Sequence, residues 1–172
     1  VERSRGLGDV YKRQERMSVV YALGRNPCPS AVEKLVSLLE TDDNAYVRRA
    51  TAWSLANYDN QIVLEPLINA LKNDVAAVRL WSSSSLAEIG NVSLENAQLA
   101  AEQLLISLKI DNEPGVRSNC IWSLCRLYEK LNNTFQESFV DECTKIALFD
   151  KEPSVMEEAK TALDSMGMQG FY

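Results

Sequence analysis

The most constraining feature of this chain is a short motif that recurs along it. A Val-Arg pair followed by a run of small and apolar residues begins at Val47, Val78 and Val116. A fourth copy begins at Val155 with methionine in place of the arginine, and a fifth begins at Glu15 with the arginine kept. The starts are separated by 32, 31, 38 and 39 residues, a spacing that fits a repeating unit of two helices and their turns.

Each unit contains a second segment whose apolar residues recur every three or four positions, as they do along one face of a helix. Short polar turns that contain aspartate follow these segments, and no long stretch alternates with the period of two that is typical of a strand. A Ser-x-x-Glu pattern at 30–33 and a Thr-x-x-Glu pattern at 134–137 predict capping boxes at two helix starts. The second segments span residues 31–39, 62–71, 94–108 and 135–148.

One helix pair has an apolar face that it cannot bury alone, so neighbouring pairs are expected to stack and share a core. The sequence therefore predicts an all-α fold, a right-handed α-solenoid of four helix pairs plus a terminal helix. Three aromatic residues of the first helices, Trp53, Trp81 and Trp122, are interpreted as part of that core, with stacking on a ligand as the alternative. The tail, residues 166–172, is expected to cap the last helix, and a partner-binding tail is the alternative.

The amino-terminal segment is set apart from the repeat. The chain begins with valine rather than methionine, and residues 4–14 resemble the peptide obtained when a sequencing adapter is translated. We therefore predict that residues 1–14 are a non-native or disordered segment. The helical-repeat domain is predicted to span residues 15–172, with units that start near 15, 47, 78, 116 and 155.

Composition argues against several classes of function. The chain has no histidine, which excludes histidine-dependent catalytic triads, most catalytic zinc sites and His-Glu iron sites. The net charge of −6, without a basic stripe, argues against nucleic acid as a partner. No apolar run approaches the roughly 18 to 20 residues that a membrane-spanning helix needs, so a membrane is not expected as a partner.

Four cysteines are present without a CxxC spacing. We interpret Cys28, Cys120, Cys125 and Cys143 as small buried residues of a cytoplasmic protein, with a reactive thiol or cluster ligand as the alternative. No metal site, no catalytic residue and no cofactor are predicted from these residues.

The arginine of the motif recurs once per unit. Because a guanidinium offers five donors in a fixed fork, these arginines are predicted to form a ladder inside the stack, each bonded to a turn aspartate or to a helix carbonyl. A direct role in ligand binding is the alternative. The arginines are Arg48, Arg79 and Arg117.

A valine-arginine start preceded by a turn aspartate resembles the E/Z-type HEAT repeat, also called the phycobilisome-lyase HEAT-like repeat. The resemblance covers residues 15–167 and implies a HEAT/armadillo-like fold. Members of that family include bilin lyases and isomerases, cofactor-assembly helpers and interaction scaffolds. The matched positions are Val47-Arg48, Val78-Arg79 and Val116-Arg117, with Asp43, Asp74 and Asp111 before them.

The same resemblance implies that the second helices line the concave surface. Alignment of these helices brings four acidic residues into one row, and four residues later in each helix lies a mixed row of Ser37, Asn69, Ile106 and Lys145. Such an acidic row on a groove suits a basic segment of a partner protein. The alternative is that acidic residues are simply favoured in first helical turns. The acidic row comprises Glu33, Glu65, Glu102 and Asp141, and the predicted binding residues are Glu65, Asn69, Glu102, Asp141 and Lys145.

These observations predict a non-catalytic, protein-binding HEAT-repeat scaffold or assembly factor that uses its concave groove. The alternative is a bilin lyase or isomerase subunit, or a chaperone that acts on phycobiliproteins, with a phycobilin as its substrate. That alternative rests on the family resemblance alone.

Overall fold

The computed structural model describes residues 2–168 and residue 170, with side chains from residue 12 onward. Within these residues it contains nine α-helices, three short 3-10 helices and no strand. The predicted all-α solenoid and its number of helices are confirmed. In chain order the elements are α1 (Glu2–Arg25), η1 (Pro29–Ala31), α2 (Val32–Thr41), α3 (Ala45–Leu55), η2 (Gln61–Val63), α4 (Leu64–Asn73), α5 (Ala76–Gly90), α6 (Leu94–Ile110), α7 (Pro114–Leu127), η3 (Tyr128–Lys130), α8 (Asn133–Phe149) and α9 (Pro153–Ser165).

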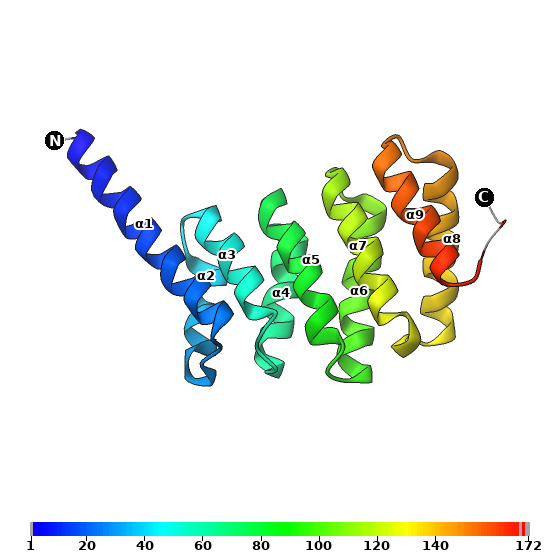
Figure 1. Ribbon diagram of the computed structural model, residues 1–172, viewed down its shortest axis with the longest axis horizontal. Helices are drawn as coiled ribbons and strands as arrows, with labels where there is room; N and C mark the ends of the chain where they lie inside the picture. Colours follow the sequence, from blue (N-terminus) through cyan, green and yellow to red (C-terminus); the bar gives the residue numbers. More distant parts are fainter. Residues whose placement is uncertain (1, 169, 171–172) are drawn as a thin grey trace.

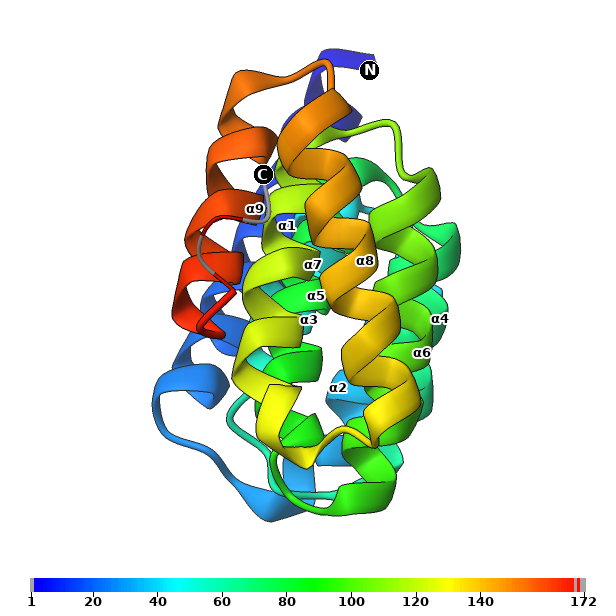
Figure 2. The same ribbon diagram turned by 90° about the vertical axis from the view of Figure 1, so that its right-hand side faces the viewer.

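The helices form two layers that run side by side along the stack (Figures 1 and 2). The odd layer consists of α1, α3, α5, α7 and α9, and the even layer consists of α2, α4, α6 and α8. Each even helix packs against the odd helix that follows it across a short turn. The four pairs are therefore α2–α3, α4–α5, α6–α7 and α8–α9, and the extra helix is α1. The sequence analysis instead placed the extra helix at the carboxyl-terminal end of the stack, in the unit that begins near residue 155.

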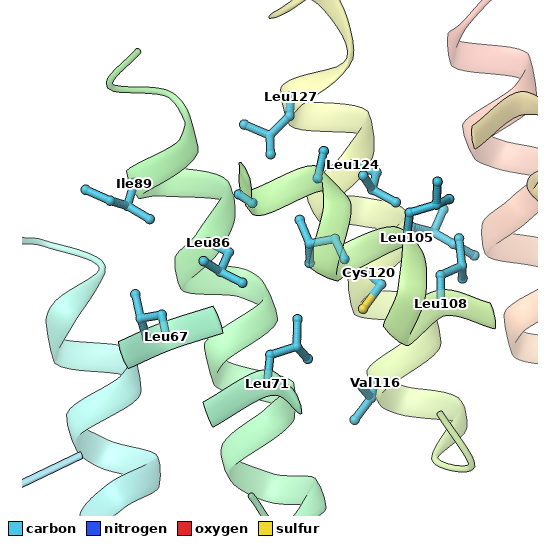
Figure 3. Packing of buried hydrophobic residues seen from close by; sticks show 14 of the residues in the cluster. Leu67, Leu71, Leu86, Ile89, Leu105, Leu108, Val116, Cys120, Leu124 and Leu127 are labelled. Carbon is cyan, nitrogen blue, oxygen red and sulfur yellow. The ribbon is translucent and has the colours of Figure 1, made fainter. Parts of the chain in front are cut away.

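The core lies between the two layers, where one set of residues recurs in every motif. In the four motif copies that begin with valine, at positions 47, 78, 116 and 155, that valine is buried. The leucine eight residues after it lies on the same side of the helix and is also buried. Figure 3 shows leucines of α4 and α6 directed toward those of α5 and α7. Burial of each such leucine contributes about 1.5–3 kcal/mol. The buried leucines of the motif are Leu55, Leu86, Leu124 and Leu163.

Odd helices lie closer to one another than even helices do. Small residues permit this approach, and Ser85 Oγ of α5 donates a hydrogen bond of 2.7 Å to the carbonyl of Ala52 in α3. Ser123 Oγ of α7 likewise donates to the carbonyl of Ser83 in α5 at 2.8 Å. In a curved two-layer stack the layer with the shorter helix spacing lies on the inside, so the stack curves toward the odd layer. The expectation that the second helices line the concave surface is therefore wrong.

Helix α1 includes most of the segment that was predicted to be non-native or disordered. It runs without interruption from Glu2 to Arg25, so residues 2–14 are helical. Elongation of a helix that is already nucleated costs little, and the carboxyl-terminal part of α1 is anchored by its packing on α3. The non-native origin of residues 1–14 stays a prediction.

Helix starts differ from the two predicted capping boxes. Ser30 lies inside η1, and α2 begins after Ala31 without a side-chain cap. At α8 the cap is Asn132, whose side chain accepts a hydrogen bond of 3.0 Å from the amide of Phe135. Thr134 is already inside that helix. Asparagine is among the strongest capping residues, so α8 starts at the first residue that offers one.

Part of the predicted carboxyl-terminal cap is visible. Met166 and Met168 are partly buried and pack against the core, and the amide of Met168 donates to the carbonyl of Leu163 at 2.9 Å. The remainder of that cap, residues 169, 171 and 172, lies outside the described residues. Among the described helices, none is both long enough and apolar enough to span a bilayer.

Candidate functional site

A ladder of ion pairs runs along the turns that join the two layers. Arg48 donates from Nε and Nη2 to the carboxylate of Asp74, both at 2.8 Å, and from Nη1 to the carbonyl of Asp42 at 2.8 Å. Arg79 repeats this pattern with the carboxylate of Asp111 at 2.7 and 2.8 Å and the carbonyl of Asp74 at 2.9 Å. Each arginine therefore bonds its own turn and the turn of the next unit.

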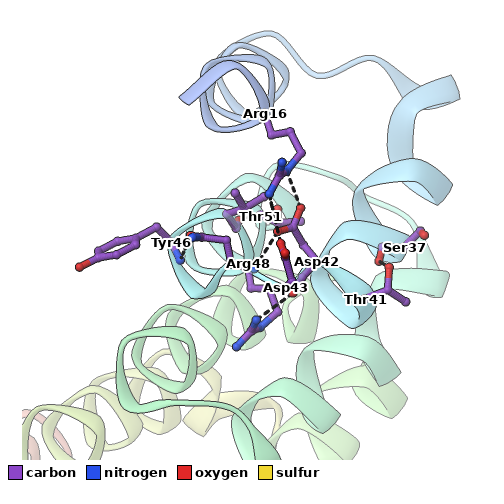
Figure 4. A network of polar contacts seen from close by, with 10 residues as sticks. Arg16, Ser37, Thr41, Asp42, Asp43, Tyr46, Arg48 and Thr51 are labelled. Carbon is purple, nitrogen blue, oxygen red and sulfur yellow. Dashed lines mark hydrogen bonds and ion pairs between the residues drawn. The ribbon is translucent and has the colours of Figure 1, made fainter. Parts of the chain in front are cut away.

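The ladder continues in both directions. Arg16 of α1 pairs with Asp42 at 2.8 and 3.1 Å, as Figure 4 shows. Arg117 of α7 pairs with Asp150 at 2.8 Å and with the carbonyl of Asp111 at 3.0 Å. The predicted ladder is confirmed: Arg48, Arg79 and Arg117 each bond both a turn carboxylate and a backbone carbonyl. These contacts span neighbouring turns, so the arginines hold the turns together, and Nε of Arg117 is left buried without a hydrogen-bond partner among the described residues.

One carboxylate of the ladder, that of Asp111, is kept ionised by its partners. Burial opposes the charged form of Asp111, but hydrogen bonds from Arg79 and from the amide of Glu113 outweigh that effect and hold the pKa of Asp111 below its usual value. The hydrogen bond from Arg48 to Asp74 raises the pKa of Arg48, and the bond to Asp111 raises that of Arg79. The pair of Arg79 and Asp111 therefore stays charged at neutral pH.

The predicted binding residues all lie on the even layer. One acidic residue projects from each of α4, α6 and α8, so the row foreseen from the alignment is present at the surface. Lys145 Nζ lies 3.6 Å from Glu142 Oε2, and Asn69 Oδ1 accepts a hydrogen bond of 2.7 Å from Asn73. The row faces outward from the curve, and its role in binding stays a prediction. All five predicted residues are exposed: Glu65, Asn69, Glu102, Asp141 and Lys145.

Grooves separate neighbouring even helices. They lie between α2 and α4, α4 and α6, and α6 and α8, with volumes of about 600, 410 and 430 Å³. Residues of the Arg-Asp ladder line each groove, and Asn69 is the one predicted binding residue that lines any of the three. Ile110 and Phe149, which line the groove between α6 and α8, are 72% and 78% exposed.

The sequence analysis missed the exposed face of the odd layer, which we call the inner face. Trp81 and Trp122 are 36% and 40% exposed and Trp53 is half-buried, so their interpretation as core residues is wrong. Trp53 and Trp122 follow the buried valine of their motif by six residues, or about 240° around the helix. That angle directs both side chains away from the core, and it could have been read from the sequence.

The first hollow of the inner face, the Trp81 pocket, lies between α1, α3 and α5. It has a volume of about 260 Å³ and is lined by Tyr21, Arg49, Trp53 and Trp81. The rings of Tyr21 and Trp53 are tilted against each other with centroids 5.5 Å apart. Arg49 Cζ lies 5.5 Å from the ring centroid of Tyr46. The pocket thus combines three aromatic walls with one guanidinium.

The second hollow, the Trp122 pocket, lies between α5, α7 and α9 and measures about 240 Å³. Asn119 is fixed there, because its Nδ2 donates to the carbonyl of Leu80 at 2.8 Å and also bonds the Ser84 hydroxyl. Arg126 Cζ lies 4.9 Å from the ring centroid of Trp122. The lining residues are Ser84, Gly115, Ser118, Asn119, Trp122 and Glu158.

The four cysteines differ in the accessibility and acidity of their thiols. Cys120 and Cys143 are buried, as predicted, and burial raises the pKa of both thiols far above the usual value. Burial also raises the pKa of Cys125 to about 11. Cys28 is exposed, contrary to prediction, and a hydrogen bond with Ser30 lowers its pKa.

Two of the four thiols, those of Cys120 and Cys143, are enclosed in the core, whereas that of Cys28 is exposed. Over the described residues, no group of three or more acidic or cysteine side chains is arranged to hold a metal ion.

The designed proteins that resemble this chain share its fold. A designed armadillo repeat protein in complex with the peptide (KR)4 has a TM-score of 0.61 and 19% sequence identity, over 89% of this chain and 74% of that one. An engineered protein has a TM-score of 0.62 and 21% identity, over 90% of this chain and 74% of that one. No curated protein matches the chain.

A family model described as HEAT repeats matches residues 12–87 and 32–125. The matched region contains three copies of the Val-Arg motif and all four ladder arginines. This chain belongs to the HEAT-repeat family.

Proposed function

We propose that this chain is a scaffold or assembly factor that holds an extended segment of a partner protein along its inner face. Stacked helical repeats create long continuous surfaces, and proteins of this architecture generally use them to bind other proteins. The observation that carries the proposal is the exposure of Trp81 and Trp122 beside two separate pockets of the odd layer.

Exposed tryptophans beside a pocket have a physical use. Tryptophan is among the residues that contribute most to binding energy at protein interfaces, because a large rigid ring is desolvated at a small cost in conformational entropy. Each pocket can receive one side chain of a partner. The hydrogen bonds that fix Asn119 and the ring contact of Trp53 also hold the pockets in one arrangement before binding.

The designed armadillo repeat protein of similar fold was captured with a peptide of alternating lysine and arginine. Its example supports an extended peptide as the kind of ligand that such a stack can hold. For this chain, a basic segment is the partner expected from the acidic row of Glu65, Glu102 and Asp141 on the even layer. Exposure of these three carboxylates, one per helix, makes the even layer the alternative binding surface.

A capture experiment with two matched variants separates the surfaces. Partner proteins are captured on the wild-type chain from an extract of the source cells and then tested for binding to W81A/W122A and to E65Q/E102Q/D141N. Our proposal expects the tryptophan variant to lose partners about tenfold or more and the acidic variant to keep them. Circular dichroism checks that both variants fold. The opposite pattern would move the binding surface to the even layer, and unchanged capture by both variants would refute the two proposed surfaces.

A further inference from the structure

The two pockets of the inner face carry opposite charges. Arg49 is the charged residue of the Trp81 pocket, and Glu158 is the charged residue of the Trp122 pocket. Within the part of the chain that the structure describes, neither belongs to an ion pair. Two opposite charges are thus presented at separate positions along one surface.

Neighbouring charges leave this polarity in place. Arg126 packs on Trp122 beside the second pocket, and its Nη2 lies 2.8 Å from Glu88 Oε1, so that pair is neutral as a whole. Beside the Trp81 pocket, Arg13 Cζ lies 5.6 Å from the ring centroid of Tyr46, on which Arg49 also packs. A second cation strengthens the positive character of that end. The inference rests on Arg49 alone, because Arg13 falls in the segment of predicted non-native origin.

We infer that the segment bound on the inner face has its charges separated, with an acidic side chain at the Trp81 pocket and a basic side chain at the Trp122 pocket. This inference rests on the proposed function and specifies the chemistry of the partner. An acidic side chain pairs with Arg49 while its neighbour contacts the rings of the pocket. A lysine or arginine lays its methylene groups along Trp122 and brings its charge to Glu158.

The spacing of the two charges follows from the helix stack. The Trp81 pocket lies between α1, α3 and α5, and the Trp122 pocket lies between α5, α7 and α9, so their centres are two helix spacings apart. At about 8–10 Å between neighbouring helices, their centres are about 15–20 Å apart. An extended chain rises about 3.3 Å per residue, so the two charged side chains are separated by about five or six residues. A uniformly basic segment would place a like charge beside Arg49 and lose affinity.

Synthetic peptides test the separation of charge. Fluorescence anisotropy compares four labelled peptides: one with glutamates at its amino end and lysines at its carboxyl end, its reverse, an isomer of the same composition with the charges interleaved, and (KR)4. One of the two separated peptides is expected to bind about tenfold more tightly than the interleaved isomer and (KR)4.

Charge reversal links that preference to the two pockets. Arg49→Glu or Glu158→Lys should each weaken binding of the preferred peptide by about tenfold, and the double variant R49E/E158K should prefer the peptide of reversed charge order. Lys72→Glu on the even layer is the matched control and should change binding less than about twofold.

Two outcomes overturn the inference in different ways. Equal binding of the separated and interleaved peptides, still lost in Trp81→Ala, would refute the charge order and leave the proposed function standing. Failure of the folded protein to bind any of the peptides at millimolar concentration would count against both.

Discussion

The odd and even layers share one core but present different surfaces. Both layers bury leucines in the shared core, yet small side chains such as Ser85 let the odd helices approach closely, while the even helices stand apart and leave grooves. The close layer exposes tryptophans, whereas the open layer exposes carboxylates and aliphatic residues. A common apolar pattern therefore specifies the stack, and the residues beside that pattern specify its curvature and its binding surface.

The largest expected effect concerns the ladder that joins the layers. Arg79→Ala should lower the free energy of unfolding by about 3–5 kcal/mol, because it leaves the carboxylate of Asp111, which is 6% exposed, without its partner. Denaturant unfolding measures the change. Arg126→Ala removes an ion pair whose two side chains are 42% and 43% exposed, and should cost less than about 1 kcal/mol. Equal losses would mean that the ladder does not hold the layers together.

Close approach within the odd layer is tested by adding one methyl group. A Cβ on Gly90 of α5 would lie 2.9 Å from Cδ2 of the fully buried Leu127 in α7. Gly90→Ala should therefore destabilise the protein by about 1–3 kcal/mol through overpacking. Gly115→Ala is the control, because its Cβ would meet the end of Leu80 at 3.3 Å and the helix gains a better former. Thermal unfolding that ranks Gly90→Ala as the more stable variant would contradict the close spacing.

Much of the fold could be read from the sequence, because Val47, Val78 and Val116 recur once in each two-helix unit and the turns carry their own signals. The partners of the arginines could not be assigned, since Arg48 bonds the turn aspartate 26 residues ahead, in the next unit. Such a contact depends on how units stack, and a single unit contains no information about it.

The candidate site, too, could be predicted only in part from the sequence. Exposure of Glu65 and Glu102 follows from the periodicity of their helices and was predicted. The side of the curve on which they lie depends on the spacing between helices, which the apolar pattern does not set. Trp122 was wrongly assigned to the core for another reason. The assignment rested on its hydrophobicity, although its position about 240° around the helix from the buried valine directs it away from the core.

Acid should lower the free energy of unfolding through the ladder, by less than either of the two substitutions Arg79→Ala and Gly90→Ala. The pKa of Asp111 is lowered in the folded state from the ordinary value of 3.8, so the stability that it contributes is complete above that pH and is lost as the pH falls through the folded pKa. The free energy of unfolding should therefore decline below about pH 4. Asp111→Asn should reduce that slope, measured by urea unfolding at several pH values. An unchanged slope would show that Asp111 is not ionised by its partners.

The smallest effect is expected on the open surface of the even layer. Ile106 is 43% exposed, so Ile106→Ser should change the free energy of unfolding by less than about 0.5 kcal/mol. Leu104 of the same helix is fully buried, and Leu104→Ser should cost several-fold more. A large loss for Ile106→Ser would mean that another part of the protein covers this surface.

Photo-crosslinking in cells tests most directly which of the two layers binds the partner protein. A photoreactive amino acid replaces Ser118 beside Trp122 on the inner face, or Asn69 in the groove between α2 and α4. If the odd layer binds the partner, irradiation produces a covalent partner adduct from position 118 and none from position 69. Adducts from position 69 alone would contradict the assignment of binding to the inner face.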